Sequence, residues 1–132
     1  MTDHRTWVFI ANRKMDEEEA IRINDELQRF VSNWKTHGKP IDASGFCFEY
    51  AAIVIAANEA EVQASGCSID KINQLVRSLG STLGIDFFNR FNVLTRTDSG
   101  EWHIERYSPH IANTCINANV ISLNQLNQLI IN

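Results

Sequence analysis

The chain has 132 residues, of which 44% are hydrophobic and 21% are charged, and its formal net charge is −4. This length and composition suit one globular domain, residues 1–132, and exclude a disordered chain, which would be poorer in hydrophobic residues. The acidic balance argues against a broad surface for nucleic acid or anionic lipid, because both need clustered Lys and Arg.

No run reaches the eighteen or so apolar residues of a membrane span, and charge follows the first residue too soon for a signal peptide. We therefore expect a soluble, cytoplasmic protein. The cysteines form no CxxC pair and the histidines no HxH or HExxH pair, so we predict reduced thiols, no metal and no cofactor. These residues are Cys47, Cys67, Cys115, His4, His37, His103 and His110.

The first predicted element is a strand at residues 7–11, a short apolar and aromatic run. A helix follows over 20–34, where apolar residues recur at spacings of three and four. Asp16 and the glutamate three residues on predict a capping box at its start. Gly38 and Pro40 are expected to end this helix, since glycine adopts a left-handed conformation and proline cannot continue the ladder.

Two β-rich runs over 46–58 predict a hairpin that turns at 49–51. Apolar residues over 69–83 again step by three and four, and they predict a second helix that ends at Gly84. Ser68 is the expected N-cap of this helix.

A second hairpin is predicted from strands at 91–97 and 101–107, because Gly100 suits the left-handed position of a short turn. The tail, residues 108–132, is rich in Asn, and the leucines from 123 onward permit a short C-terminal helix.

This order of elements predicts an α+β fold, the ferredoxin-like βαββαβ sandwich with an extra C-terminal strand and a helical tail. In that topology the helices cover one face of the sheet. The first two strands then run in one direction, and the third and fourth run in the other.

Residues 65–70 form the most distinctive candidate site in the sequence. They stand at the start of a predicted helix, whose free N–H groups and dipole favour negative charge. Ser65, Gly66, Cys67 and Ser68 are therefore candidate residues for binding an anion or another small ligand. The alternative is structural: the serines cap the helix, Gly66 turns the chain and Cys67 is a small buried side chain.

Short distinctive motifs lie at 12–13, 34–38, the hairpin through Tyr50, 64–70 (Ala-Ser-Gly-Cys-Ser-Ile-Asp) and 87–90. They resemble those of a family of small bacterial proteins that is often labelled "ABC transporter ATPase". The resemblance spans most of residues 7–90 and implies a shared fold and surface. Asn58 and Asn89 stand where similar proteins tend to carry Asp, so no acid, base or metal role transfers to them.

The ATPase label has no residues here to support it. A phosphate-binding loop needs a glycine-rich cradle with Lys and Ser or Thr, whereas the only Gly-Lys pair runs into Pro40. The GxSxG motif of serine hydrolases is also absent from the sequence.

The expected topology separates two candidate sites. Cys67 would lie near the end of the first helix and hence near His37, which is the only nucleophile and base pair that the topology allows. Arg13, Tyr50 and Arg90 would gather at the opposite end, where they could bind an acidic ligand or protein.

These residues leave two functional hypotheses. The first is a non-enzymatic domain that binds a small anion or a protein partner, or assembles as a homodimer through an edge strand. The second is a thiol-dependent enzyme or redox-responsive protein that uses Cys67 at a helix N-terminus. An exposed Cys67 thiol beside His37 would favour the second hypothesis, and a buried thiol the first.

Overall fold

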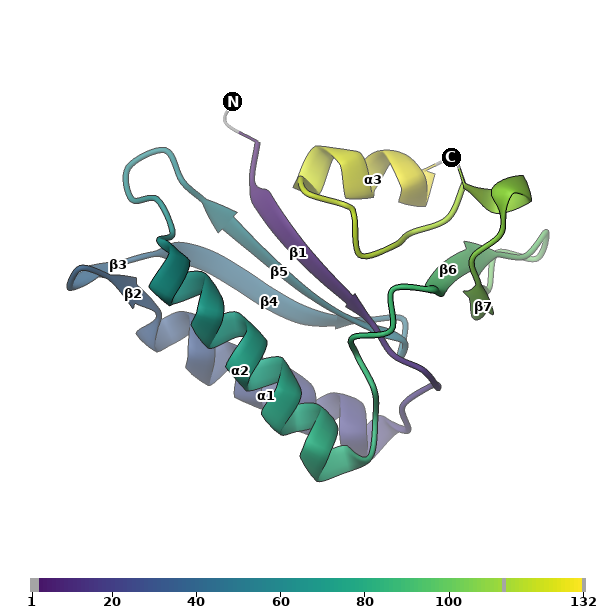
Figure 1. Ribbon diagram of the computed structural model, residues 1–132, viewed down its shortest axis with the longest axis horizontal. Coiled ribbons are helices and arrows are strands. Elements are labelled where there is room, and N and C mark those ends of the chain that lie inside the picture. Colours follow the sequence, from purple (N-terminus) through teal and green to yellow (C-terminus); the bar gives the residue numbers. More distant parts are fainter. Residues whose placement is uncertain (1–2, 113, 132) are drawn as a thin grey trace.

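Figure 1 shows the computed structural model, which describes residues 3–112 and 114–131 and arranges them in layers about a three-stranded antiparallel sheet. Sheet and helices together confirm the α+β class. In the order in which they lie side by side, the strands are β1 (Arg5–Ile10), β5 (Ala52–Asn58) and β4 (Asp42–Phe48).

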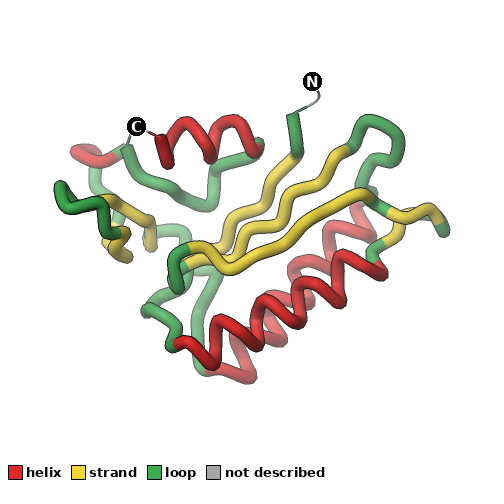
Figure 2. The backbone as a smooth tube through the Cα atoms, turned by 180° about the vertical axis from the view of Figure 1, so that it is seen from behind, coloured by secondary structure: helices red, strands yellow, loops and turns green. Residues whose placement is uncertain are grey.

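Two long helices, α1 (Glu17–Asn33) and α2 (Gly66–Leu83), cover one face of the sheet, as the sequence predicted (Figure 2). Their apolar stripes and alternate residues of the strands form one core. Its fully buried members include Ile23, Leu27, Ile53, Ile55, Ile72 and Val76.

The C-terminal third of the chain covers the other face of the sheet (Figure 1). It forms a second core in which Val8 and Val54 of the sheet pack with Leu94 and Leu126. Since both faces of β5 are buried, its sequence is apolar at nearly every position instead of alternating. The covering elements are β6 (Asn92–Arg96), β7 (Trp102–Arg106), the short 3₁₀ helix η1 (Pro109–Ile111) and α3 (Leu123–Ile131).

The predicted start of α1 is confirmed, and the predicted end is wrong. Asp16 and Glu19 form the capping box, with hydrogen bonds of 2.8 and 3.0 Å between side chain and backbone. The helix stops at Asn33, because the chain turns back on itself with His37 at φ +50° and Gly38 at φ +77°. This turn joins two short strands, β2 (Lys35–Thr36) and β3 (Lys39–Pro40).

Helix α2 begins earlier than predicted. Its N-cap is Ser65, whose hydroxyl accepts a hydrogen bond from the N–H of Ser68 at 3.2 Å, so the assignment of Ser68 as N-cap is wrong. Ser68 lies inside the first turn, and its carbonyl accepts a 2.9 Å hydrogen bond from the indole of Trp34. The predicted end is confirmed, since Gly84 adopts φ +67° and its N–H donates to the carbonyl of Gly80.

Both predicted hairpins and the C-terminal helix are present. As predicted, β1 and β4 run in the same direction, because both are antiparallel to β5. The next strand, β6, pairs with β7 in a separate sheet and does not extend the main one. The ferredoxin-like topology is therefore not confirmed. No helix in the described part of the chain is both long enough and apolar enough to cross a membrane.

Candidate functional site

The outer edge of β1 is only partly paired. The N–H of Thr6 donates to the carbonyl of Ile121 at 2.9 Å, on the side away from β5. Because alternate residues of a strand direct their backbone groups to the same edge, the N–H and C=O groups of Val8 and Ile10 also face outward. Within residues 3–112 and 114–131, no hydrogen bond satisfies these outward groups.

The opposite edge of the sheet, on β4, is partly covered by side chains of α1. The amide of Gln28 donates to the carbonyl of Gly45 at 2.9 Å, and that of Asn24 accepts from the N–H of Cys47 at 2.8 Å. Such covering prevents a strand edge from pairing with other chains. Side chains of α1 therefore bond part of the β4 edge, whereas the outward groups of Val8 and Ile10 on the β1 edge have no hydrogen-bond partner among the described residues.

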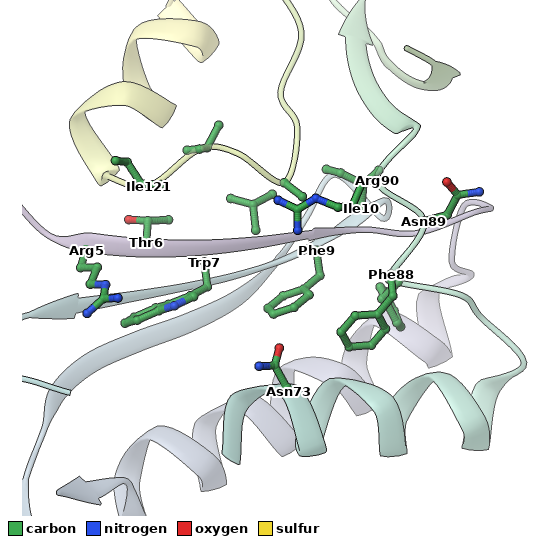
Figure 3. A pocket seen from close by; sticks show the side chains of 14 residues that line it. Arg5, Thr6, Trp7, Phe9, Ile10, Asn73, Phe88, Asn89, Arg90 and Ile121 are labelled. Atoms are coloured by element: carbon green, nitrogen blue, oxygen red, sulfur yellow. The ribbon is translucent and has the colours of Figure 1, made fainter. Parts of the chain in front are cut away.

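A groove of about 250 Å³ follows the partly paired edge of β1 (Figure 3). One wall includes Asn73 of α2 and Phe88, and the other includes Val120 and Ile121 from the tail. Arg90, in the connection between α2 and β6, lies at the end near Ile10.

Aromatic rings form much of the wall on the helix side. The rings of Phe9 and Phe88 meet edge to face with centroids 5.6 Å apart. The guanidinium of Arg77 lies 4.9 Å from the centroid of Phe88, and that of Arg5 lies 5.1 Å from Trp7. These cation–π contacts hold the rings in place and bring positive charge to the wall.

The charge of the groove is opposite to that of the whole chain. Arg5 and Arg90 line it, and no described carboxylate does. Arg90 donates to the amide oxygen of Asn119 at 2.8 Å, and Arg5 lies 3.7 Å from Glu59. Arg90 has no carboxylate partner among the described residues, and the side chain of Arg5 stays 46% exposed beside its ion pair with Glu59, so both guanidinium groups can contact an anionic group in the groove.

The candidate anion site at the start of α2 is organised mainly by its own cap. The hydroxyls of Ser65 and Ser68 bond within the first turn, where Ser68 is buried. Gly66 and Cys67 are exposed. Ser65 and Ser68 therefore follow the structural alternative, although the N–H groups of Gly66 and Cys67 still face the region where an anion could bind.

Cys67 is exposed, as the enzyme hypothesis requires, but it is not hydrogen-bonded to the expected base within the described residues. His37 lies in the exposed turn between β2 and β3, and no hydrogen bond in the described part of the chain joins the two side chains. The other thiols are less accessible: burial raises the pKa of Cys47, and Cys115 is almost fully buried. No group of three or more His, Cys, Asp or Glu side chains among the described residues could hold a metal ion.

The structure does not bring Arg13, Tyr50 and Arg90, the second candidate surface, together in one site. Only Arg90 lines the groove. Arg13 forms a bidentate pair with Glu19 at 2.9 and 2.8 Å and donates to the carbonyl of Leu83 at 2.8 Å. The hydrogen bonds from Arg13 lower the pKa of Glu19 to about 2. Tyr50 lies half-exposed in the turn between β4 and β5, at φ +59°.

Among the residues that line the groove, the sequence predicted only Arg90 as a binding residue. Val8 and Ile10 read as ordinary core residues because their side chains are buried, and only the pairing of the strands reveals their unpaired backbone groups. Asn73 and Ile121 carry no local signal at all. The one available signal was the 87–90 motif, which supplies Phe88 and Arg90.

Comparison of the chain with protein-family models, with curated proteins and with solved structures finds no match. The resemblance described from the short motifs therefore stays a prediction.

Proposed function

We propose that this protein is a non-enzymatic binding domain and that its binding site is the groove along the outer edge of β1. The proposal rests on the backbone groups of Val8 and Ile10, which have no hydrogen-bond partner within the described residues and lie along a mainly apolar groove bordered by two arginines. Apolar concave sites with a few convergent polar groups are the usual places where proteins bind ligands.

The fold supports this assignment. We infer that β1, α1, β4, β5 and α2 correspond to the first five elements of a ferredoxin-like sandwich, and that the groove occupies the position of its fourth strand. The bacterial family suggested by the motifs shares 87–90, which borders this groove. We also propose a cytoplasmic location, because all three cysteines are free thiols.

The second candidate function is a thiol-dependent enzyme or redox-responsive protein, which the exposure of Cys67 favours. It ranks second because a nucleophilic thiol is normally activated by a neighbouring base or cation, and His37 makes no hydrogen bond to Cys67 in the described structure. A bound anion at Ser65, Gly66, Cys67 and Ser68 belongs to this second candidate.

Amide NMR with a library of small apolar and anionic fragments tests the two functions. We expect bound fragments to shift the amides of Val8, Ile10 and Asn89. The variant N73W should abolish this binding by filling the groove, whereas Q74W, an exposed neighbour on the same helix, should retain it. Fragments that shift only the start of α2, or thioester turnover that C67S abolishes, would support the enzyme instead.

A further inference from the structure

We propose that the partner at this groove is an extended segment of another protein, which adds to β1 as a fourth strand and carries acidic residues on both sides of an apolar centre. This inference rests on the proposed function, because it requires the groove to be the binding site. It adds the chemical class of the partner and the mode of binding.

The spacing of the outward backbone groups favours an extended peptide as the ligand. The outward N–H and C=O groups of Val8 and Ile10, together with the C=O of Thr6, recur every second residue, which is about 7 Å along a strand. A partner strand presents complementary groups at the same repeat, whereas a compact small molecule can reach only one or two of them.

These backbone groups also gain from being paired. Val8 and Ile10 are only 3% and 2% exposed, so water has little access to their polar atoms. Backbone groups that are shielded from water without a partner destabilise a protein, and a hydrogen-bonded strand would remove that penalty.

The walls of the groove suit alternating side chains. Successive side chains of an added strand point to opposite faces of the sheet. On the helix side they would meet Phe9 and Phe88, and on the other side Val120 and Ile121. Both sets are apolar, so the centre of the bound segment should be apolar on both faces.

The charges at the ends of the groove determine the flanking residues. Arg5 lies near the start of β1 and Arg90 near its end, and no described carboxylate lines the space between them. Arginine binds carboxylates through paired, charge-assisted hydrogen bonds. Acidic residues at each end of the bound segment would therefore be stabilised, and basic residues would be repelled.

A second copy of this chain does not fit the same edge. The paired tail, residues 121–123, occupies the start of the edge at His4 and Thr6, and the groove walls flank the remainder. Two such edges related by a two-fold axis would bring their walls together before their strands could pair. A single segment from a partner can enter where another complete sheet cannot.

Two pools of seven-residue peptides test the inference on the intact protein. Both pools vary Val, Leu and Phe at the five central positions, and one carries Asp or Glu at its ends where the other carries Lys. We expect the acidic pool to bind and the basic pool to bind at least about tenfold more weakly. The variant R90E should remove most of this preference, because only Arg5 then attracts an acidic end, while R22E, with the same charge change on the exposed face of α1, should preserve it.

The backbone of the best-binding peptide tests the mode of binding. Methylation of the peptide nitrogens at alternate residues should abolish binding for one of the two possible sets and spare the other, because only one set pairs with β1. Hydrogen exchange at the amides of Val8 and Ile10 should slow at least about tenfold in the complex.

Different results identify different failures. If fragments occupy the groove but neither peptide pool binds, or if both methylated sets bind equally, the strand-addition inference is wrong and the binding-domain proposal stands. If nothing shifts the groove amides, the proposed function is also wrong. Concentration-dependent dimerisation that protects Val8 and Ile10 without peptide would overturn the inference in favour of a second copy.

Discussion

Arg13 shows how a single residue can look like a binding group and instead connect elements of the fold. Its guanidinium bonds to Glu19 in the first turn of α1 and to the carbonyl of Leu83 in the last turn of α2. Carboxylates stabilise helix starts and cations stabilise helix ends, so one ion pair serves both helices. The same contacts leave Arg13 few donors for a ligand.

Replacing Glu19 with Gln should lower the melting temperature at pH 7 by a few degrees, because the pair with Arg13 and the charge at the helix start are lost. The folded-state pKa of Glu19 is depressed to about 2 from an ordinary value of 4.5. Its stabilising effect is therefore complete above the ordinary value and is lost as the pH falls toward 2.

Thermal unfolding of wild type and E19Q between pH 2 and 7 measures this effect. The two curves should converge at the acidic end. The control is E18Q, which removes an exposed neighbouring charge and should change the melting temperature much less. A gap between wild type and E19Q that stays constant with pH would contradict the assigned pair.

At the scale of elements, the close approach between the end of α2 and the chain that follows it shapes the groove. Gly80 lies against this segment, and a Cβ atom there would be 2.5 Å from the carbonyl oxygen of Ile85 and 3.4 Å from the ring of Phe87. Glycine at this position therefore lets 85–88 pack against the helix and lets Phe88 reach the groove.

The substitution G80A should reduce the free energy of unfolding by about 1–3 kcal/mol, because the backbone at Ile85 must move to admit the methyl group. Urea unfolding measures the loss. S81A is the matched control: this neighbouring residue is exposed, and alanine favours a helix, so stability should be unchanged or slightly higher. Equal stability of G80A and wild type would show that the contact is not tight.

The elements that could be predicted from sequence are those determined by their own periodicity and end signals. Asp16 and Gly84 mark helix ends through local geometry, and both were identified. Gly38 carries the same kind of signal, but tertiary structure uses it in a hairpin turn. The groove could not be predicted, since it depends on β6 pairing with β7 while residues 121–123 pair with β1.

At the scale of the whole molecule, two cores share one sheet. The helices cover one face, and the C-terminal third covers the other through residues such as Leu126 of α3 and Trp102 of β7. Because β5 contributes side chains to both cores, loss of packing on either face weakens the same strand. We therefore expect the two layers to unfold together.

Truncation of Leu126 tests this coupling. L126A removes a side chain that is 1% exposed and should cost about 2–5 kcal/mol in unfolding free energy. Q128A, on the exposed side of the same helix, should cost far less. Fluorescence and circular dichroism should report one coincident transition in urea for both variants. Separate transitions would mean that the C-terminal layer folds independently.

The bridge between Arg5 and Ser122 also has a consequence for the nascent chain. β1 is synthesised before its tail partner, which is made roughly a hundred residues later, after a delay on the order of ten seconds. During that time the β1 edge lacks this native bridge. Chaperones that hold extended apolar segments would therefore have their best opportunity to engage this protein before synthesis reaches residue 122.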